Sequence, residues 1–186
     1  MNDYHLEFCA SAEWRQVVEE TILPVALRHV DLGPRVLEIG PGPGFTTDVL
    51  RTKTDHLTAV EIDPGLAASL AARTAGTNVA VVQGDARHLR FPDHHFSGAA
   101  SFHMLHHIEP DEAQNEVFAE IARVVERGGT FVAADGMENE STRAFHVDDV
   151  YNPVDPGDLE VRLRAAGFSE VEVRIHDLGW LCTART

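Results

Sequence analysis

The stretch Val36-Leu37-Glu38-Ile39-Gly40-Pro41-Gly42-Pro43-Gly44-Phe45-Thr46-Thr47 decides the fold of this chain. An apolar run ends in three alternating glycines, and a helix-like segment over residues 46–52 follows. This order predicts a parallel strand, a tight turn and the beginning of a helix. Glycines allow the sharp turn and the close approach of a ligand, and the first N–H groups of the helix are unpaired beside it. The stretch therefore predicts a binding site, and the rest of the chain must identify the ligand.

The size and charge of the chain exclude several classes of partner. With 186 residues, 44% of them hydrophobic, it is long enough to form one domain with a buried core. Its net charge of -15 repels phosphate backbones and anionic lipids, so we expect no nucleic-acid partner and no membrane partner. No apolar run approaches the ~18 residues of a membrane helix, and residues 1–7 lack the pattern of a signal peptide. Cys9 and Cys182 form no C-x-x-C motif, which predicts free thiols in a reducing cytoplasm.

The chain alternates between predicted strands and predicted helices. Ser11 is the expected N-cap of a first helix over residues 11–30, which Pro24 should kink or restart. Repeated strand–helix–strand units imply a mostly parallel sheet with helices on both faces. The last two strands are joined at Gly179 too tightly for a crossover, so the last should run antiparallel. We expect a single domain, residues 1–186, with a helical lid over 1–30 and a core over 31–186. The predicted strands are 35–39, 57–62, 79–83, 96–102, 130–134, 171–176 and about 180–185, and the later helices are 65–74, 110–126 and 158–166, with Gly128-Gly129 as the turn into the fifth strand.

Two cofactor classes compete for the glycine turn. The dinucleotide fingerprint G-x-G-x-x-G needs a glycine at its sixth place. Phe45 occupies that place here, and the third glycine is Gly44. The turn therefore departs from the nicotinamide pattern, although an NAD(P)-binding oxidoreductase stays an alternative.

Glu38 followed by G-x-G-x-G resembles motif I of the class I S-adenosylmethionine-dependent methyltransferases. The closing strand pair is similar to the end of their sheet, and the resemblance extends from about Asp31 onward. It implies a three-layer α/β/α sandwich whose seven strands have the order 3-2-1-4-5-7-6. It also implies S-adenosyl-L-methionine as cofactor, S-adenosyl-L-homocysteine as product, and methyl transfer to a small molecule, as in the type 11/25-like branch. A non-catalytic protein that binds this cofactor is a second alternative.

The strand ends carry the expected cofactor ligands. Ligands of such sheets bind outside the carboxyl ends of the strands, where Glu61 can accept from ribose hydroxyls. The resemblance implies that Ile62 packs on the adenine, that Asp85 and Ala86 hold its edge, and that Glu38 faces the methionine end. It places a backbone carbonyl at Ser101 or Phe102 near the ammonium. The complete predicted cofactor set is Glu38, Gly40, Pro41, Gly42, Gly44, Phe45, Thr46, Glu61, Ile62, Asp85, Ala86, Ser101 and Phe102.

Three histidines follow the fourth predicted strand. In a helix, His103, His106 and His107 would share one face, which is a possible metal arrangement. No carboxylate motif accompanies them, so we expect no metal. His103, nearest the strand end, is the first candidate for a general base, and His106 is the second. Acceptor recognition is expected from residues 4–14 and 135–156, both of which contain aromatic side chains.

The opening also resembles the ribosomal RNA adenine dimethyltransferases, which share its Glu-Ile-Gly-Pro-Gly and Glu-Ile-Asp segments. Those enzymes carry Asn-Leu-Pro-Tyr after the fourth strand, where this chain has Ser101-Phe102-His103-Met104. The acidic charge also argues against RNA. We therefore expect a small-molecule acceptor and a monomer or homodimer.

Overall fold

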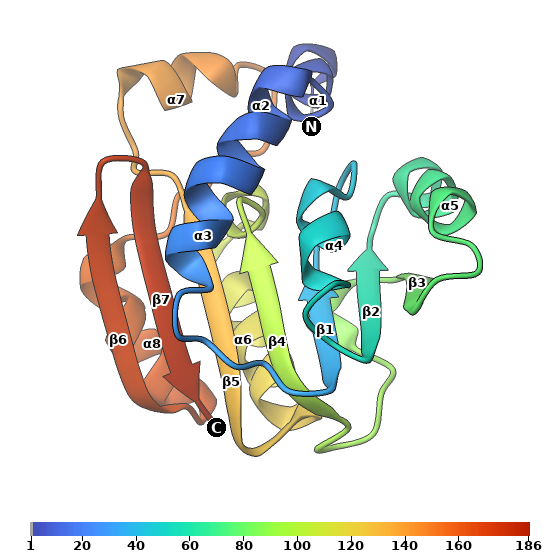
Figure 1. Ribbon diagram of the computed structural model, residues 1–186. Coiled ribbons are helices and arrows are strands. Elements are labelled where there is room, and N and C mark those ends of the chain that lie inside the picture. The colour runs from blue at the N-terminus through green and yellow to red at the C-terminus, as the bar shows by residue number, and fades with distance from the viewer. Residues whose placement is uncertain (1) are drawn as a thin grey trace.

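The computed structural model describes residues 2–186, so Met1 of the predicted lid lies outside the described residues. Within them, one seven-stranded sheet has the order β3-β2-β1-β4-β5-β7-β6 (Figure 1). The predicted α/β fold and strand order are confirmed. The strands are β1 (Arg35–Ile39), β2 (His56–Glu61), β3 (Val79–Gln83), β4 (Phe96–Phe102), β5 (Val125–Asp135), β6 (Ser169–His176) and β7 (Gly179–Arg185).

The strand pairing brings the predicted ligands to one edge of the sheet. β1 runs parallel to both neighbours, and its last residue, Ile39, is opposite Val60 of β2 and Ser101 of β4. β7 is antiparallel to β5 and to β6. The carboxyl ends of β1, β2 and β4 therefore lie side by side, and the segments that follow them converge there.

Helices cover both faces of the sheet (Figure 1). On one face, α3 (Leu23–Ala26), α4 (Phe45–Leu50) and the π-helical turn η1 (Val18–Ile22) pack on side chains such as Val36 and Val132. On the other, α6 (Asp111–Val124) and α8 (Pro156–Ala166) pack on neighbours of opposite orientation, such as Leu37 and Phe131. The alternation follows from the period of two along each strand. α5 (Pro64–Arg73) connects β2 to β3, and α1 (Asp3–Cys9), α2 (Ala12–Val17) and α7 (Glu140–Phe145) gather over the carboxyl ends.

The N-terminal segment corrects one expectation. Ser11 is an N-cap, as predicted, and its hydroxyl accepts from the Trp14 N–H. The helix, however, does not extend to residue 30. It passes from α2 through η1 into α3 and ends at Ala26, and a separate α1 precedes it. Pro24 has no N–H to donate, and the turn before it widens so that the Leu23 N–H bonds to the Val18 carbonyl.

The glycine pair before the fifth strand is also placed differently from the prediction. β5 begins at Val125, so Gly128 and Gly129 lie within it rather than before it. Val125 pairs with Phe96 while Thr130 pairs with Gly98, and the register shifts between them. The Gly128 N–H donates to the Thr186 carbonyl, which explains how the irregular stretch stays paired. Among residues 2–186, no helix has the length and apolarity to cross a membrane.

Candidate functional site

A cavity of about 660 Å³ lies over the carboxyl ends of β1, β2 and β4. The glycine turn and the segments after β2, β3 and β4 form its wall, and side chains of α1, α2 and η1, such as Leu6, Trp14 and Ile22, form its cover. The predicted cofactor residues that line it are Gly40, Pro41, Gly42, Phe45, Thr46, Glu61, Ile62, Asp85, Ala86 and Phe102. Glu38, Gly44 and Ser101 are outside the set of described residues that line it.

Gly42 presents its backbone to the cavity. Its φ of 53° is left-handed. Apart from Gly42 itself and its two chain neighbours, no described residue has an atom within 4 Å of the position that a Cβ would take. Its N–H donates to Glu61 Oε2 over 2.9 Å. A side chain here would be strained and would project into open space, so the glycine keeps that space available for a ligand.

Glu61 connects the glycine turn to the segment after β2. Its other oxygen, Oε1, accepts from the Asp63 N–H over 3.0 Å, and the residue is 5% exposed. Asp63 in turn caps α5 by accepting from the Gly65 and Leu66 N–H groups. Two backbone donors thus fix the Glu61 carboxylate at the cavity wall, and its remaining lone pairs can accept from hydroxyls.

Glu38 is buried behind the glycine turn, and it does not belong to the described residues that line the cavity. It is 1% exposed, and its two oxygens accept from the hydroxyls of Thr46 and Thr47, the latter over 2.7 Å. Burial raises the pKa of Glu38 to about 7, although these two hydrogen bonds oppose the shift. Glu38 is thus connected to the cavity wall through Thr46, which lines the cavity.

Gly44 also serves packing in this structure. A Cβ there would lie 2.4 Å from Arg73 Nη2 and 2.5 Å from Leu70 Cδ1, both from α5. The Arg73 guanidinium donates to the Pro43 and Gly44 carbonyls and forms an ion pair with Asp48 of α4 at 2.7 Å. Gly44 therefore lets α5 brace the turn.

The segments after β2 and β3 form the wall predicted to hold the adenine. Ile62 is 61% exposed although it is a large apolar residue, and it lines the cavity. After β3, Asp85 accepts hydrogen bonds from both the backbone N–H and the guanidinium of Arg87. Arg87 belongs to the short helix η2 (Ala86–His88). The hydrogen bond to the Arg87 side chain lowers the pKa of Asp85. Arg87 was missed in the sequence, and it also lines the cavity.

Ser101 and Phe102 end β4 on opposite faces of the sheet. Phe102 lines the cavity. Ser101 is 1% exposed, and its hydroxyl has no hydrogen-bond partner among residues 2–186.

The histidines after β4 do not share one helical face. His103 has a left-handed φ of 51°, and only Leu105–His107 form a short helix, η3. His103 lines the cavity, and the centroid of its ring is 5.0 Å from that of Trp14. His106 is 7% exposed and is not among the described residues that line the cavity. The local backbone after a buried strand thus separates residues that helical spacing would bring together.

Asp135, at the end of β5, was not predicted as a site residue. Its Oδ1 lies 2.6 Å from His106 Nδ1 and 3.8 Å from His103 Nδ1. Burial alone would raise the pKa of Asp135, but the charge and hydrogen bond of His106 outweigh it and lower the pKa to about 2. Burial lowers the pKa of His103 to about 4, so this ring is neutral near pH 7. A carboxylate at the end of a neighbouring parallel strand is the signal that could have found Asp135.

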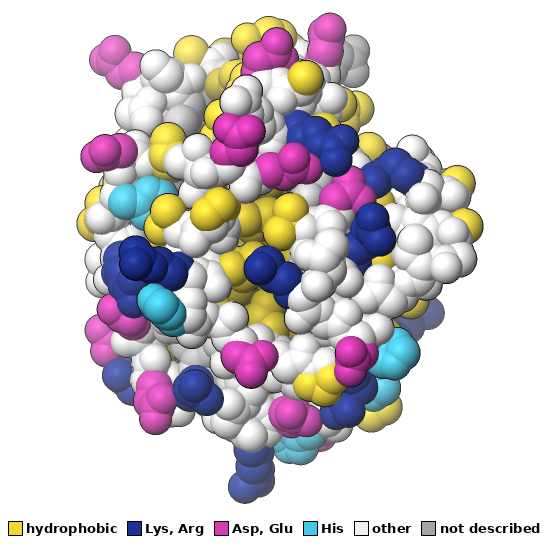
Figure 2. Space-filling view, in the orientation of Figure 1, with side chains coloured by type: hydrophobic (Ala, Val, Ile, Leu, Met, Phe, Trp, Pro, Cys, Tyr) yellow, Lys and Arg dark blue, Asp and Glu magenta, His cyan; other side chains and the backbone are white. Residues whose placement is uncertain are grey.

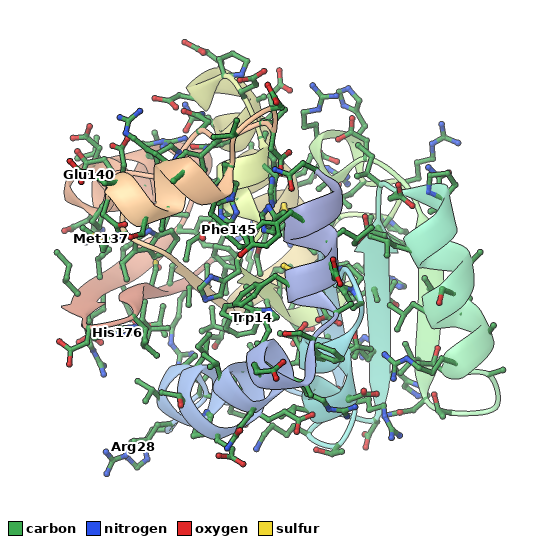
Figure 3. The ribbon with its side chains drawn as sticks, turned by 90° about the horizontal axis from the view of Figure 1, so that it is seen from above. Trp14, Arg28, Met137, Glu140, Phe145 and His176 are labelled. Atoms are coloured by element: carbon green, nitrogen blue, oxygen red, sulfur yellow. The ribbon has the colours of Figure 1, made fainter. Side chains whose placement is uncertain are left out.

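The two segments expected to recognise the acceptor meet above the cavity. Phe145 of α7 packs against Tyr4 and Phe8 of α1, with ring centroids 5.2 and 5.1 Å apart, and Phe8 contacts Trp14 at 5.5 Å. Viewed from above, Phe145 lies between α7 and the N-terminal helices, and Trp14 lies beside the N-terminal helices (Figure 3). Of this cluster, Trp14 lines the cavity.

The cavity fits the cofactor that the motif implies. S-adenosylmethionine carries a sulfonium and an ammonium, and the wall holds the carboxylates of Glu61, Asp63 and Asp85. Gly42 leaves open space where a side chain would obstruct a ligand. Ile62 offers an exposed apolar surface for a flat ring. Residues of the required chemistry are thus present along one cavity.

Comparisons with known proteins agree with this geometry. A family model described as a methyltransferase domain matches residues 37–133. The chain is 32% identical over 118 residues to the probable ribosomal RNA small subunit methyltransferase A of Methanothermobacter thermautotrophicus. The aligned region covers 58% of this chain and 43% of that protein. The chain thus spans less than half the length of this curated relative.

Solved structures share the fold at low sequence identity. A SAM-dependent methyltransferase from Archaeoglobus fulgidus has a TM-score of 0.79 at 18% identity, covering 99% of this chain and 100% of that chain. A phosphoethanolamine N-methyltransferase from Haemonchus contortus, in complex with phosphomonomethylethanolamine and S-adenosylhomocysteine, has a TM-score of 0.69 at 20% identity, covering 87% of this chain and 38% of that chain.

Proposed function

Because the chain belongs to the methyltransferase domain family and is a class I S-adenosylmethionine-dependent methyltransferase, we propose that it methylates a small-molecule acceptor. The observation that carries the proposal is the cavity itself. It joins the glycine turn and Glu61 on one side to His103 and Trp14 on the other, beneath the N-terminal helices. A donor pocket and an acceptor space therefore form one continuous volume.

The residues of the chain have separate tasks in this proposal. When bound, S-adenosylmethionine supplies an electrophilic methyl group on a sulfonium. Glu61 accepts from the ribose hydroxyls, and Ile62 and Ala86 bind the adenine with Asp85. Gly42 permits the close approach of the cofactor to the backbone. These contacts fix the position of the donor, and positioning is the main task in an in-line displacement.

The acceptor side is assigned to His103 and to the N-terminal cover. His103 lies in the cavity with a neutral ring that can accept a hydrogen bond or a proton from a protonated acceptor. Trp14, Leu6 and Ile22 exclude water from above. His106, the second candidate base, has its Nδ1 bonded to Asp135, and we assign it no contact with the acceptor.

A small acceptor suits the charge and the cover of the cavity better than RNA does. The chain carries a net charge of -15, and on the face seen in Figure 2 basic and acidic side chains are interspersed rather than gathered into a basic surface. RNA binding relies on neutralising phosphates. The relative named as a ribosomal RNA methyltransferase supports RNA as the second candidate, and it matches over 43% of its length.

A methyl-transfer screen tests the proposal. Purified protein is incubated with methyl-labelled S-adenosylmethionine and either a fractionated metabolite extract or small-subunit ribosomal RNA. We expect label in a low-molecular-weight compound, and none with Glu61→Ala. Label in the RNA alone would establish the second candidate. Cofactor binding without labelled product from either source would support a non-catalytic binding protein.

A further inference from the structure

Four histidines from three distant segments meet beside the cavity. His5 comes from α1, His106 and His107 from η3, and His146 follows α7. One ligand nitrogen of each lies within 4.8 Å of those of the others. Their ring centroids are 4.2 to 6.2 Å apart, and His5, His106 and His146 are buried.

Each of these rings is held by its Nδ1 atom. His106 Nδ1 lies 2.6 Å from Asp135 Oδ1, and His5 Nδ1 lies 3.1 Å from Asp149 Oδ2. His146 Nδ1 lies 2.6 Å from the Thr142 carbonyl, and His107 Nδ1 lies 3.3 Å from the Val150 carbonyl. Hydrogen bonds from Nδ1 to carboxylates or carbonyls are the outer-shell contacts that orient metal-binding histidines. They leave Nε2 as the nitrogen available to a ligand.

Two of these Nε2 atoms are buried without a hydrogen-bond partner. Within residues 2–186, His106 Nε2 and His146 Nε2 have none, and the two residues are 7% and 9% exposed. A buried imidazole nitrogen that makes no hydrogen bond is costly. A ligand at the centre of the cluster would satisfy both atoms at once.

We propose that His5, His106, His107 and His146 bind one divalent transition-metal ion, with Zn²⁺ as the preferred ion. Neutral imidazoles suit this class of metal, and four ligands complete a tetrahedral site. With Zn–N bonds of about 2.1 Å, tetrahedral ligand nitrogens lie roughly 3.4 Å apart. The present separations, up to 4.8 Å, therefore need a small inward movement of the rings.

The ion would fasten the cover of the cavity to the sheet. His5 belongs to the N-terminal segment and His146 to the α7 segment, whereas His106 and His107 are anchored after β4. His107 and Asp149 line the cavity. A closed set of four protein ligands favours a structural role over a catalytic one. Metal binding should therefore order α1 and α7.

Metal titration of the protein without an affinity tag tests the site. After dialysis against a chelator, the chain should bind one Zn²⁺ in calorimetry, and Co²⁺ should give the intense visible spectrum of a tetrahedral complex. His146→Gln should weaken Zn²⁺ binding by more than the roughly 10–100-fold that loss of an outer-shell partner costs. Asp149→Asn should weaken it within that range. His56→Gln, at the opposite end of β2, is the matched control and should bind Zn²⁺ as the parent does.

Two further readouts separate the site from a folding defect. Circular dichroism and S-adenosylhomocysteine binding should be unchanged in His146→Gln, and hydrogen exchange in α1 should slow on adding Zn²⁺ to the parent but not to this variant. The absence of Zn²⁺ binding in calorimetry, an octahedral Co²⁺ spectrum, or equal Zn²⁺ affinity in the parent and His146→Gln would each overturn the proposal. The titrations contain no methyl donor, so they are independent of the proposed activity.

Discussion

Glu38 is a buried carboxyl group whose protonation affects the stability of the fold. Its two oxygens are bonded to Thr46 and Thr47, and burial raises its pKa to about 7 from 4.5. The folded chain therefore holds this proton more tightly than the unfolded chain does. The resulting stabilisation is complete below about pH 4.5 and is lost as pH rises through about 7.

Glu38→Gln should remove this pH dependence. Between pH 5 and pH 8, the parent should lose up to about 3 kcal/mol of unfolding free energy that the variant keeps, since each pKa unit corresponds to about 1.4 kcal/mol. Urea unfolding of both proteins at the two pH values measures the difference. Equal changes in the two proteins would show that Glu38 titrates normally.

Gly42→Val should abolish cofactor binding because its side chain enters the cavity. Gly76→Val is the matched control, since Gly76 also has a positive φ of 77° and open space around it but is remote from the cavity lining. Both variants should lose about 1–2 kcal/mol of stability from backbone strain. Calorimetry with S-adenosylhomocysteine should show at least roughly 100-fold weaker binding for Gly42→Val alone. A similar loss of S-adenosylhomocysteine affinity in both variants would indicate that backbone strain, and not obstruction of the cavity, is responsible.

At the scale of elements, α5 supports the turn from behind. Arg73 donates to the Pro43 and Gly44 carbonyls and pairs with Asp48 of α4. The turn, α4 and α5 are thus connected through one guanidinium. Gly44 allows this contact because a Cβ would collide with Leu70 and Arg73.

Arg73→Met should loosen the turn and weaken S-adenosylhomocysteine binding by roughly 10-fold, the effect of about one net hydrogen bond. Arg51→Met is the control, because Arg51 approaches the same Asp48 at 3.7 Å. Among residues 2–186, the Arg51 side chain makes no hydrogen bond or ion pair with the turn. Calorimetry with S-adenosylhomocysteine on both variants separates the effect of the hydrogen bonds to the turn from the effect of removing a cation beside Asp48. Equal affinities of the parent and Arg73→Met for S-adenosylhomocysteine would show that the turn keeps its shape without the contact from α5.

At the scale of the whole molecule, the cavity draws on segments that are far apart in sequence, from Leu6 to Val150. It is lined by α1, α2, the glycine turn and the loop that contains Asp149 and Val150. A ligand that fills it should therefore stabilise the entire fold and not one element. Ligand-induced stabilisation grows with the ratio of ligand concentration to Kd.

S-adenosylhomocysteine at 100 times its Kd should stabilise the domain by about 2.7 kcal/mol. For a domain of this size, that corresponds to a rise in Tm of roughly 5–10 °C. NAD at the same concentration should leave Tm unchanged. A thermal-shift assay makes the comparison, and a larger shift with NAD would contradict the cofactor assignment.

The sequence by itself determined the alternation of strands and helices, the glycine turn and the strand-end position of Glu61, because strand and helix periodicities are local and parallel strands end at one edge of a sheet. The strand order was implied by the resemblance to the methyltransferase family, and the structure confirms it. The sequence also indicated the cap at Ser11. Its error at Gly128 lies where an irregular backbone continues through a residue that usually ends an element.

Only the tertiary structure decided which way Glu38 points, that Asp135 lies beside His106, and that His5 and His146 meet at the same place. Residues 5, 106 and 146 have no periodic relation along the chain. Their proximity depends on how α1 and α7 pack over the sheet, and that packing is set by contacts between segments far apart in sequence, which no local pattern encodes.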